Sequence, residues 1–137
     1  MAFEGYLSCG ACHFDGDDDG RVYDFSTRGE GLRNTPALLG RKGTGHGRLN
    51  WSGTFDEVQD FEHQIRELFD GRGFIPDDVF HVGTRDQPLG ERKAGLSPEL
   101  DALSAYVTSL DHVNPSPYRN PDGSLTADGV AGKALFA

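Results

Sequence analysis

Cys9-Gly10-Ala11-Cys12-His13 is the stretch that decides the fold of this 137-residue chain. Two cysteines that are separated by two residues and followed by a histidine form the C-x-x-C-H attachment signature of a covalently bound haem c. Each thiol can form a thioether to one vinyl group of the same porphyrin, and the histidine then binds the iron as the proximal ligand. The chain has two cysteines in all, so the sequence predicts one haem c attached through Cys9, Cys12 and His13.

Two other interpretations of these five residues stay open. A C-x-x-C redox pair would open a helix in a thioredoxin-like βαβ pattern, but the sequence shows no alternation of β-branched strands with helices. A zinc site could use Cys9 and Cys12 with His46 and His63. The spacing of these two histidines is much longer than that of a zinc finger, so the motif favours haem.

Composition limits the partners of the chain. It has 13 basic and 22 acidic residues, which give a net charge of −9. Nucleic acid is therefore excluded as an expected partner, because its phosphates carry the same sign of charge. A redox protein with a basic surface would be attracted by the negative electrostatic field of the chain. Only 36% of the residues are hydrophobic and 19 are glycine, so much of the chain is expected to be loop. The apolar faces of a porphyrin could serve as the centre of such a small core.

The sequence also bears on location. It contains no apolar run long enough to span a membrane. Residues 1–8 lack the basic and apolar regions of a secretory signal. Because haem is attached to c-type cytochromes outside the cytoplasm, we expect a periplasmic or extracellular protein whose signal peptide is absent from this chain.

Three segments have helical patterns. A short helix is expected over 10–14, around the haem motif. A second is expected over 54–70, where Thr54 would cap a stripe of apolar residues spaced by three and four. A third is expected over 97–110, with Ser97 as its cap and a proline in its first turn.

The remaining segments read as loops. Residues 15–31 and 41–47 are rich in glycine and charge, and strand signals are nearly absent. The expected fold is mostly α with long loops, in which residues 1–110 form the haem domain. Three prolines make 111–126 an extended linker, and a tail helix is expected over 127–137.

Further elements resemble those of a known family. Arg33-Asn34-Thr35-Pro36 resembles the R-N-T-P element of the di-haem cytochrome c peroxidase superfamily, and Leu38-Leu39-Gly40 and Trp51-Ser52-Gly53 continue the pattern. The resemblance covers roughly residues 6–110. It implies a class I cytochrome c-like α-helical domain, in which Arg33 would lie near a haem propionate and Trp51 near the haem edge.

The sequence departs from this family in two ways. The family has two haems, and this chain has one attachment motif. The family's G-K-x-L-F helix precedes the motif, whereas here Gly132-Lys133-Ala134-Leu135-Phe136 lies at the far end. Two explanations stay open: the chain is one unit of a longer multi-haem protein, or its tail associates head to tail with another copy.

The sixth iron ligand is expected to be a histidine, because the single methionine is Met1. His46 is preferred, since the glycines around it would let the backbone approach a porphyrin face. His63 is the second candidate, although helix geometry predicts that its ring faces solvent. His81 and His112 are weaker candidates.

An acidic loop follows the motif. Asp15, Asp17 and Asp19 match the opening D-x-D-x-D-G of a calcium loop, and Ser26 stands where a bidentate glutamate is usual. Calcium binding and a solvated acidic loop are both compatible with this pattern.

These observations predict a monohaem, bis-histidine cytochrome that transfers single electrons and is not an enzyme. The alternative is a peroxidase-like enzyme with an open distal site, where His46, Glu62 or His63 would act as the acid or base. A third possibility is a repeating unit of a conductive cytochrome assembly.

Overall fold

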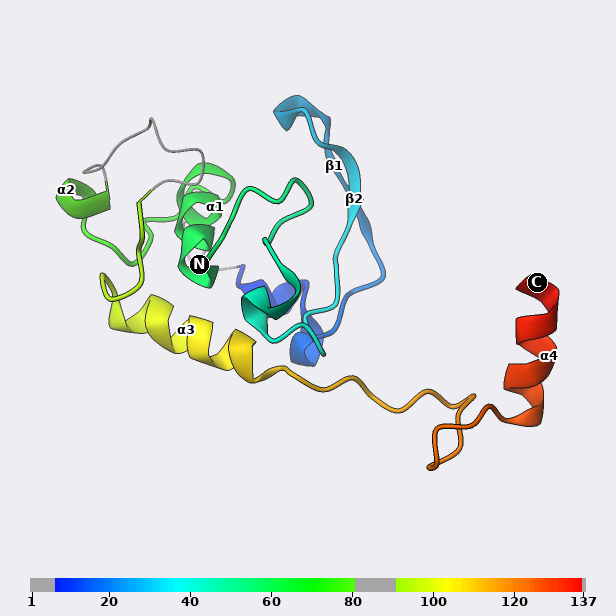
Figure 1. Ribbon diagram of the computed structural model, residues 1–137. Helices are drawn as coiled ribbons and strands as arrows, with labels where there is room; N and C mark the ends of the chain where they lie inside the picture. The colour runs from blue at the N-terminus through cyan, green and yellow to red at the C-terminus, as the bar shows by residue number, and fades with distance from the viewer. Residues whose placement is uncertain (1–6, 81–90, 137) are drawn as a thin grey trace.

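The computed structural model describes residues 7–80 and 91–136. Within these ranges the chain forms a small helical body, a projecting hairpin and a separate C-terminal helix (Figure 1). The α-helices are α1 (Phe61–Glu67), α2 (Asp77–Phe80), α3 (Pro98–Ser109) and α4 (Ala127–Phe136). The strands are β1 (Val22–Phe25) and β2 (Gly31–Asn34). The 3-10 turns are η1 (Cys9–Ala11), η2 (Phe14–Gly16), η3 (Ser26–Arg28), η4 (Gly43–His46) and η5 (Val58–Asp60). Helical segments outweigh strands, and the class I cytochrome architecture stays a prediction.

The hydrophobic core lies between α1 and α3. Ile65 of α1 and Leu100 of α3 enclose Ile75, and Phe80 of α2 packs against them. The segment before α2 is fixed by Glu62, a fully buried side chain that accepts hydrogen bonds from the backbone N–H groups of Phe74 and Ile75. A buried carboxylate is tolerated when its oxygens are satisfied in this way.

The predicted helix over 54–70 begins later than expected. Its first turn is η5, and α1 follows from Phe61. Thr54 is not the cap: Glu57 and Asp60 form a reciprocal capping box. Phe55, which the apolar pattern assigned to the helix, instead pairs with Leu49 in an isolated β-bridge. The backbone bonds of this bridge use the groups that an earlier helical turn would need.

The predicted helix over 97–110 is confirmed as α3. The Ser97 side chain accepts a hydrogen bond from the backbone N–H of Leu100, and Pro98 occupies the first turn. Both features are typical of a helix N-terminus. The helix packs against η5 and η4, which places it beneath α1 (Figure 1).

The prediction that residues 15–31 form only a loop was wrong. β1 and β2 pair as an antiparallel hairpin with Tyr23 opposite Arg33 and Phe25 opposite Gly31. Opposite residues point to the same face of a sheet, so Tyr23, Phe25 and Arg33 share one face, which is half-buried. Val22 and Leu32 point to the other face and are more than 60% exposed, at 63% and 66%.

The haem motif does not form the single short helix expected over 10–14. The motif begins with η1, and η2 follows directly after His13; Asp15 inside η2 has a left-handed backbone with φ of 49°. The predicted loop over 41–47 contains the short turn η4.

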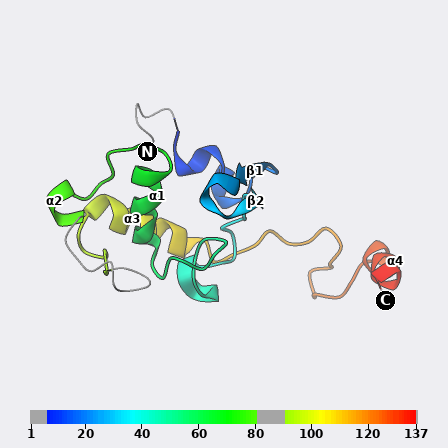
Figure 2. The same ribbon diagram turned by 90° about the horizontal axis from the view of Figure 1, so that it is seen from above.

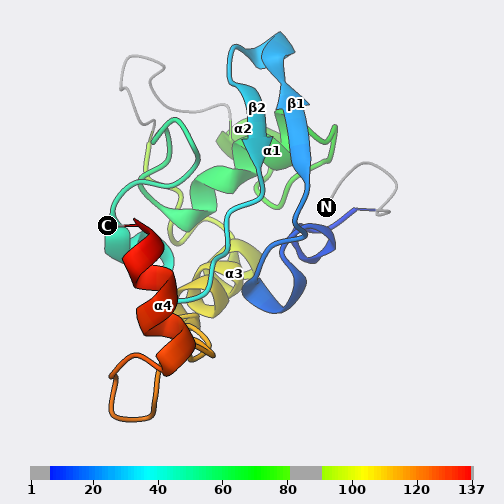
Figure 3. The ribbon, with the colours of Figure 1, turned by 90° about the vertical axis from the view of Figure 1, so that its right-hand side faces the viewer.

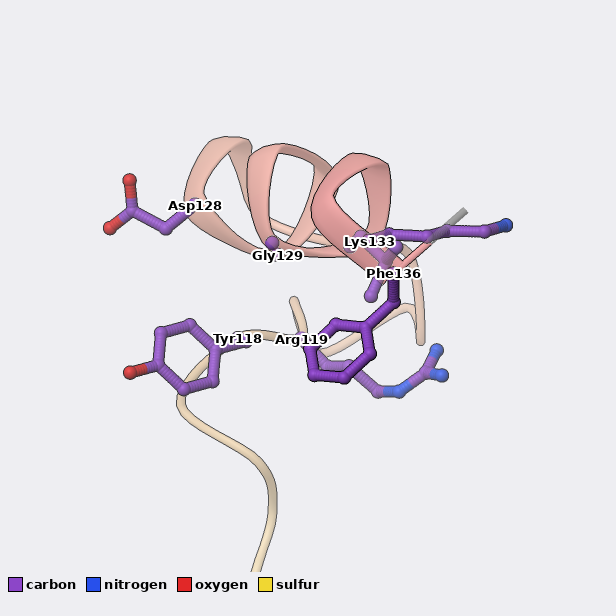
Figure 4. Close-up of a pocket in the computed structure, with 8 residues that line it drawn as sticks. Tyr118, Arg119, Asp128, Gly129, Lys133 and Phe136 are labelled. Carbon is purple, nitrogen blue, oxygen red and sulfur yellow. The ribbon is translucent and has the colours of Figure 1, made fainter.

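The C-terminal segment leaves the body after α3. Residues 111–116 have no regular secondary structure, and Arg119 and Leu125 then form a β-bridge that closes a tight turn before α4. Figures 1 and 2 show α4 standing apart from the body, and Figure 3 gives a third view. Tyr118, Arg119, Lys133 and Phe136 line a shallow groove between this turn and α4 (Figure 4). Among the described residues, no helix is long and apolar enough to cross a membrane.

Candidate haem-binding site

The C-x-x-C-H residues lie on the surface of the body, on η1 and the residues that follow it. The backbone N–H groups of Cys12 and His13 both donate to the carbonyl oxygen of Cys9, at 3.2 and 2.9 Å. The three residues of the motif therefore lie on one tight turn of backbone. Both cysteines are free thiols; Cys9 is exposed and Cys12 is half-buried. Reduced thiols are the form that thioether formation needs.

Partial burial favours the neutral form of the His13 imidazole. Desolvation lowers the pKa of His13 below its ordinary value of 6.5, although the backbone groups of Asp17 and Pro36 and the charges of Asp18 and Asp19 act in the opposite direction. Its Nδ1 atom is buried without a hydrogen-bond partner. A neutral imidazole with an unsatisfied ring nitrogen is suited to metal ligation.

Tyr23 contacts the second cysteine. Its Oη atom lies 3.5 Å from the Sγ atom of Cys12 and donates a hydrogen bond of 2.5 Å to Oδ2 of Asp19. The bond to Asp19, and then the contact with Cys12, raise the pKa of Tyr23 far above its ordinary value. The same bond lowers the pKa of Asp19. Tyr23 was not among the site residues predicted from the sequence; the alternation of Tyr23 and Phe25 is the signal that could have revealed a half-buried strand there.

The hairpin connects this contact to the two residues that the family resemblance placed near haem. Arg33 lies opposite Tyr23, and its guanidinium is 6.0 Å from the centre of the Trp51 ring. The Trp51 indole donates a hydrogen bond of 2.9 Å to the carbonyl oxygen of Asn34. The Nε atom of Arg33 is buried without a partner. The structure therefore brings Arg33 and Trp51 together, on the side of the hairpin that also carries Tyr23.

His63 is half-buried: 37% of its side chain is exposed, so the ring is only partly directed at solvent, where helix geometry predicted a solvent-facing ring. Its ring stacks on Phe55 at a centroid distance of 6.5 Å and lies 4.9 Å from the ring of Phe80. The apolar stripe did not predict this partial burial, because Phe55 lies outside the helix and stacks on the His63 ring. Desolvation, followed by the charge of Lys93, lowers the pKa of His63. Its Nδ1 atom is 3.8 Å from Oε1 of Glu67.

His46 is in a different environment. It is exposed on η4, and its Nε2 atom is 2.9 Å from the carbonyl oxygen of Gly40. The flanking glycines are present as predicted, but nothing buries the imidazole. His112 is 89% exposed, and His81 lies outside the described residues.

The acidic loop does not gather into a cation site. Within residues 7–80 and 91–136, no three His, Cys, Asp or Glu side chains are placed so that they could hold a metal ion. Asp15, Asp17 and Asp19 are therefore not brought together, because Asp19 turns toward Tyr23 and Arg21 instead. The calcium prediction is corrected on this point, and the zinc alternative with Cys9, Cys12, His46 and His63 is not supported by the geometry.

Glu62 cannot serve as the distal acid or base of a peroxidase-like site in this arrangement. Its carboxylate has no exposed surface and is occupied by two backbone N–H groups and by the Arg66 guanidinium at 2.8 Å. Its role is to hold the segment before α2.

The rest of the body fits a large apolar group. Within the described part of the chain, four hydrophobic side chains are buried: Val58, Ile65, Ile75 and Leu100. This core is small for a chain of 137 residues. Phe14, directly after His13, is 58% exposed, and Trp51 is 52% exposed. A porphyrin bonded to Cys9 and Cys12 would give such side chains an apolar surface to cover.

The chain is similar to the gamma subunit of hydrazine synthase from Kuenenia stuttgartiensis, with 30% identity over 145 aligned positions. The alignment covers 98% of this chain but 35% of that subunit, so the chain spans about a third of its relative's length. No protein-family model matches the chain, and no solved structure matches it significantly. Together with the C-x-x-C-H residues, the similarity supports a haem c protein of the cytochrome type in general terms.

Proposed function

We propose that this chain is a monohaem c-type cytochrome domain that transfers single electrons. The observation that carries the proposal is the constellation at η1, where two free thiols and a neutral, half-buried imidazole lie on one tight turn. Cys9 and Cys12 would anchor the porphyrin, and His13 would supply the proximal ligand. The bound haem would supply the one-electron couple of its iron.

The proposal also includes roles for Arg33 and Trp51. Arg33 is the cation on the Tyr23 face of the hairpin, and its buried Nε has no partner, so it is suited to a propionate carboxylate. Trp51 lies over the Arg33 guanidinium and shields it on one side. The class I cytochrome c-like fold is part of the same proposal, and it rests on the family resemblance.

For the sixth ligand we propose His63 in place of His46. The carboxylate of Glu67 lies 3.8 Å from Nδ1 of the half-buried His63 ring, and a carboxylate beside the second ring nitrogen is typical of metal-bound histidines. The exposed ring of His46 has one nitrogen directed at Gly40. With imidazole on both faces of the iron, the domain would have no position for a substrate.

The ferric absorption spectrum of the haem-loaded chain tests this proposal. We expect a six-coordinate low-spin spectrum that cyanide and peroxide do not change. His63→Ala should give a high-spin spectrum that responds to cyanide, and the matched variant His46→Ala should behave like wild type. A wild-type spectrum that is high-spin and reacts with peroxide would instead favour the peroxidase-like alternative.

The partners and location follow from the same proposal. The net charge of −9 suits a redox partner with a basic surface, and haem c attachment suits a periplasmic or extracellular location. Leu135 and Phe136 of α4 are 88% and 97% exposed, which supports self-association through the tail or a continuing multi-haem chain. Sedimentation that shows a monomer at all concentrations would contradict self-association.

A further inference from the structure

We propose that Tyr23, oriented by Asp19, is a positioning residue that holds the Cys12 thiol for covalent attachment of haem. The inference rests on the proposed haem c function and adds to it a residue outside the C-x-x-C-H motif. It follows from a three-residue contact, Asp19–Tyr23–Cys12, in which each distance is within hydrogen-bonding range.

The protons of this contact can be assigned. A phenol has one proton, and Tyr23 donates it to the carboxylate of Asp19 at 2.5 Å. Asp19 is itself fixed, because its other oxygen accepts a hydrogen bond of 3.1 Å from the backbone N–H of Arg21. The phenol oxygen is then left as an acceptor, and the group 3.5 Å from it is the Cys12 thiol. The S–H group of Cys12 therefore points toward Tyr23, which selects one rotamer of the cysteine.

Tyr23 can impose this position because the hairpin fixes it. It lies in the middle of β1, paired with Arg33 of β2, and its ring packs near Phe25 at a centroid distance of 6.4 Å. The two cysteines therefore differ before haem arrives. Cys12 is half-buried and contacts the side chain of Tyr23 on β1, whereas Cys9 is exposed.

The attachment step is an addition. The Cys12 S–H adds across a haem vinyl group: sulfur bonds to the carbon next to the ring, and the hydrogen goes to the terminal carbon. No electrons are lost or gained, and the reactants are reduced haem precursor and free thiol. The step requires the sulfur to lie within reach of one vinyl carbon. A sulfur restricted to one rotamer meets this condition more often than a freely rotating one.

The test compares Tyr23→Phe with wild type and with Tyr118→Phe, a control at an exposed tyrosine in the tail turn. The full chains are produced with haem c maturation, digested, and analysed by mass spectrometry for thioethers at each cysteine. We expect two thioethers in wild type and in the control. In Tyr23→Phe the proportion of haem bound through Cys9 alone should rise about fivefold, the effect of one hydrogen bond.

The ratio of the two thioethers separates positioning from general destabilisation, because loss of folding would reduce both bonds. If Tyr23→Phe does not fold, Asp19→Asn replaces it: the phenol proton is then less firmly held, and the same ratio should shift by a smaller amount. Equal proportions in the variants and wild type would overturn the inference and leave the proposed function intact. A wild-type chain without covalent haem would overturn both.

Discussion

Tyr23 and Arg33 face each other across the β1–β2 hairpin, and through this pair Cys12 of the C-x-x-C-H turn is linked to Trp51. Tyr23 contacts the sulfur of Cys12, and Arg33 lies 6.0 Å from the Trp51 ring. Residues that are distant in sequence are thus arranged around the C-x-x-C-H turn by a hairpin of two four-residue strands. The predictions below test the body that supports this site.

The buried ion pair between Lys93 and Asp60 should be essential to the body. Its two charged atoms are 2.7 Å apart, and the side chains are 8% and 1% exposed. Lys93→Ala leaves a buried carboxylate without its cation, and we expect a loss of about 3–5 kcal/mol in the free energy of unfolding. Urea denaturation measures it. Asp111→Asn, which breaks the exposed pair with His112, should cost less than about 1 kcal/mol. Equal effects of the two substitutions would contradict this account.

Gly73 should be intolerant of any side chain. A Cβ atom there would lie 1.9 Å from Oε1 of Glu62, a buried atom that cannot move without losing its bonds to Phe74 and Ile75. Gly73→Ala should cost more than about 2 kcal/mol in thermal or urea unfolding. Gly95→Ala is the matched control, because Gly95 also has positive φ but has open space around it. The difference between the two variants isolates the clash with Glu62, and no difference would show that the Glu62 arrangement is wrong.

Asp101 should contribute to stability at neutral pH and lose this contribution in acid. Its pKa is lowered below 3.8 by the hydrogen bond from the Gln59 side chain and then by that from the backbone N–H of Gly95. A carboxyl group with a depressed folded-state pKa stabilises the fold fully above its unfolded value and loses this effect as the pH falls through the folded value. The free energy of unfolding should therefore fall less steeply between about pH 5 and pH 2 in Asp101→Asn than in wild type. Parallel pH profiles would refute this role.

Asp19 should also influence the haem potential. Its carboxylate is joined to the Cys12 sulfur through Tyr23, so it lies close to the expected edge of the porphyrin. A negative charge there favours ferric iron, and Asp19→Asn should raise the midpoint potential by about 10–40 mV for a charge that is partly screened by water. Redox titration measures the shift, and a decrease would contradict the placement of Asp19 beside the haem.

The sequence predicted those parts of the molecule whose signals are local. Ser97 and Pro98 start α3 where the capping pattern places them, because cap and first turn lie within four residues. The short strands of the hairpin were not predicted, because Val22 and Leu32 are apolar residues on the exposed face. Apolar and polar residues therefore do not alternate clearly along the two strands. The environment of His63 also could not be deduced, because it depends on Phe55 folding back from outside the helix and on Phe80 from α2. Such contacts between distant segments have no periodic signature.

The most direct test of the central claim is denaturing mass spectrometry of the full chain produced with haem c maturation. The account predicts that wild type retains the mass of one haem after denaturation, and that Cys9→Ala and Cys12→Ala in combination remove it. A chain that carries no added mass, or a double variant that still retains haem, would contradict the assignment of Cys9, Cys12 and His13 as a haem c site.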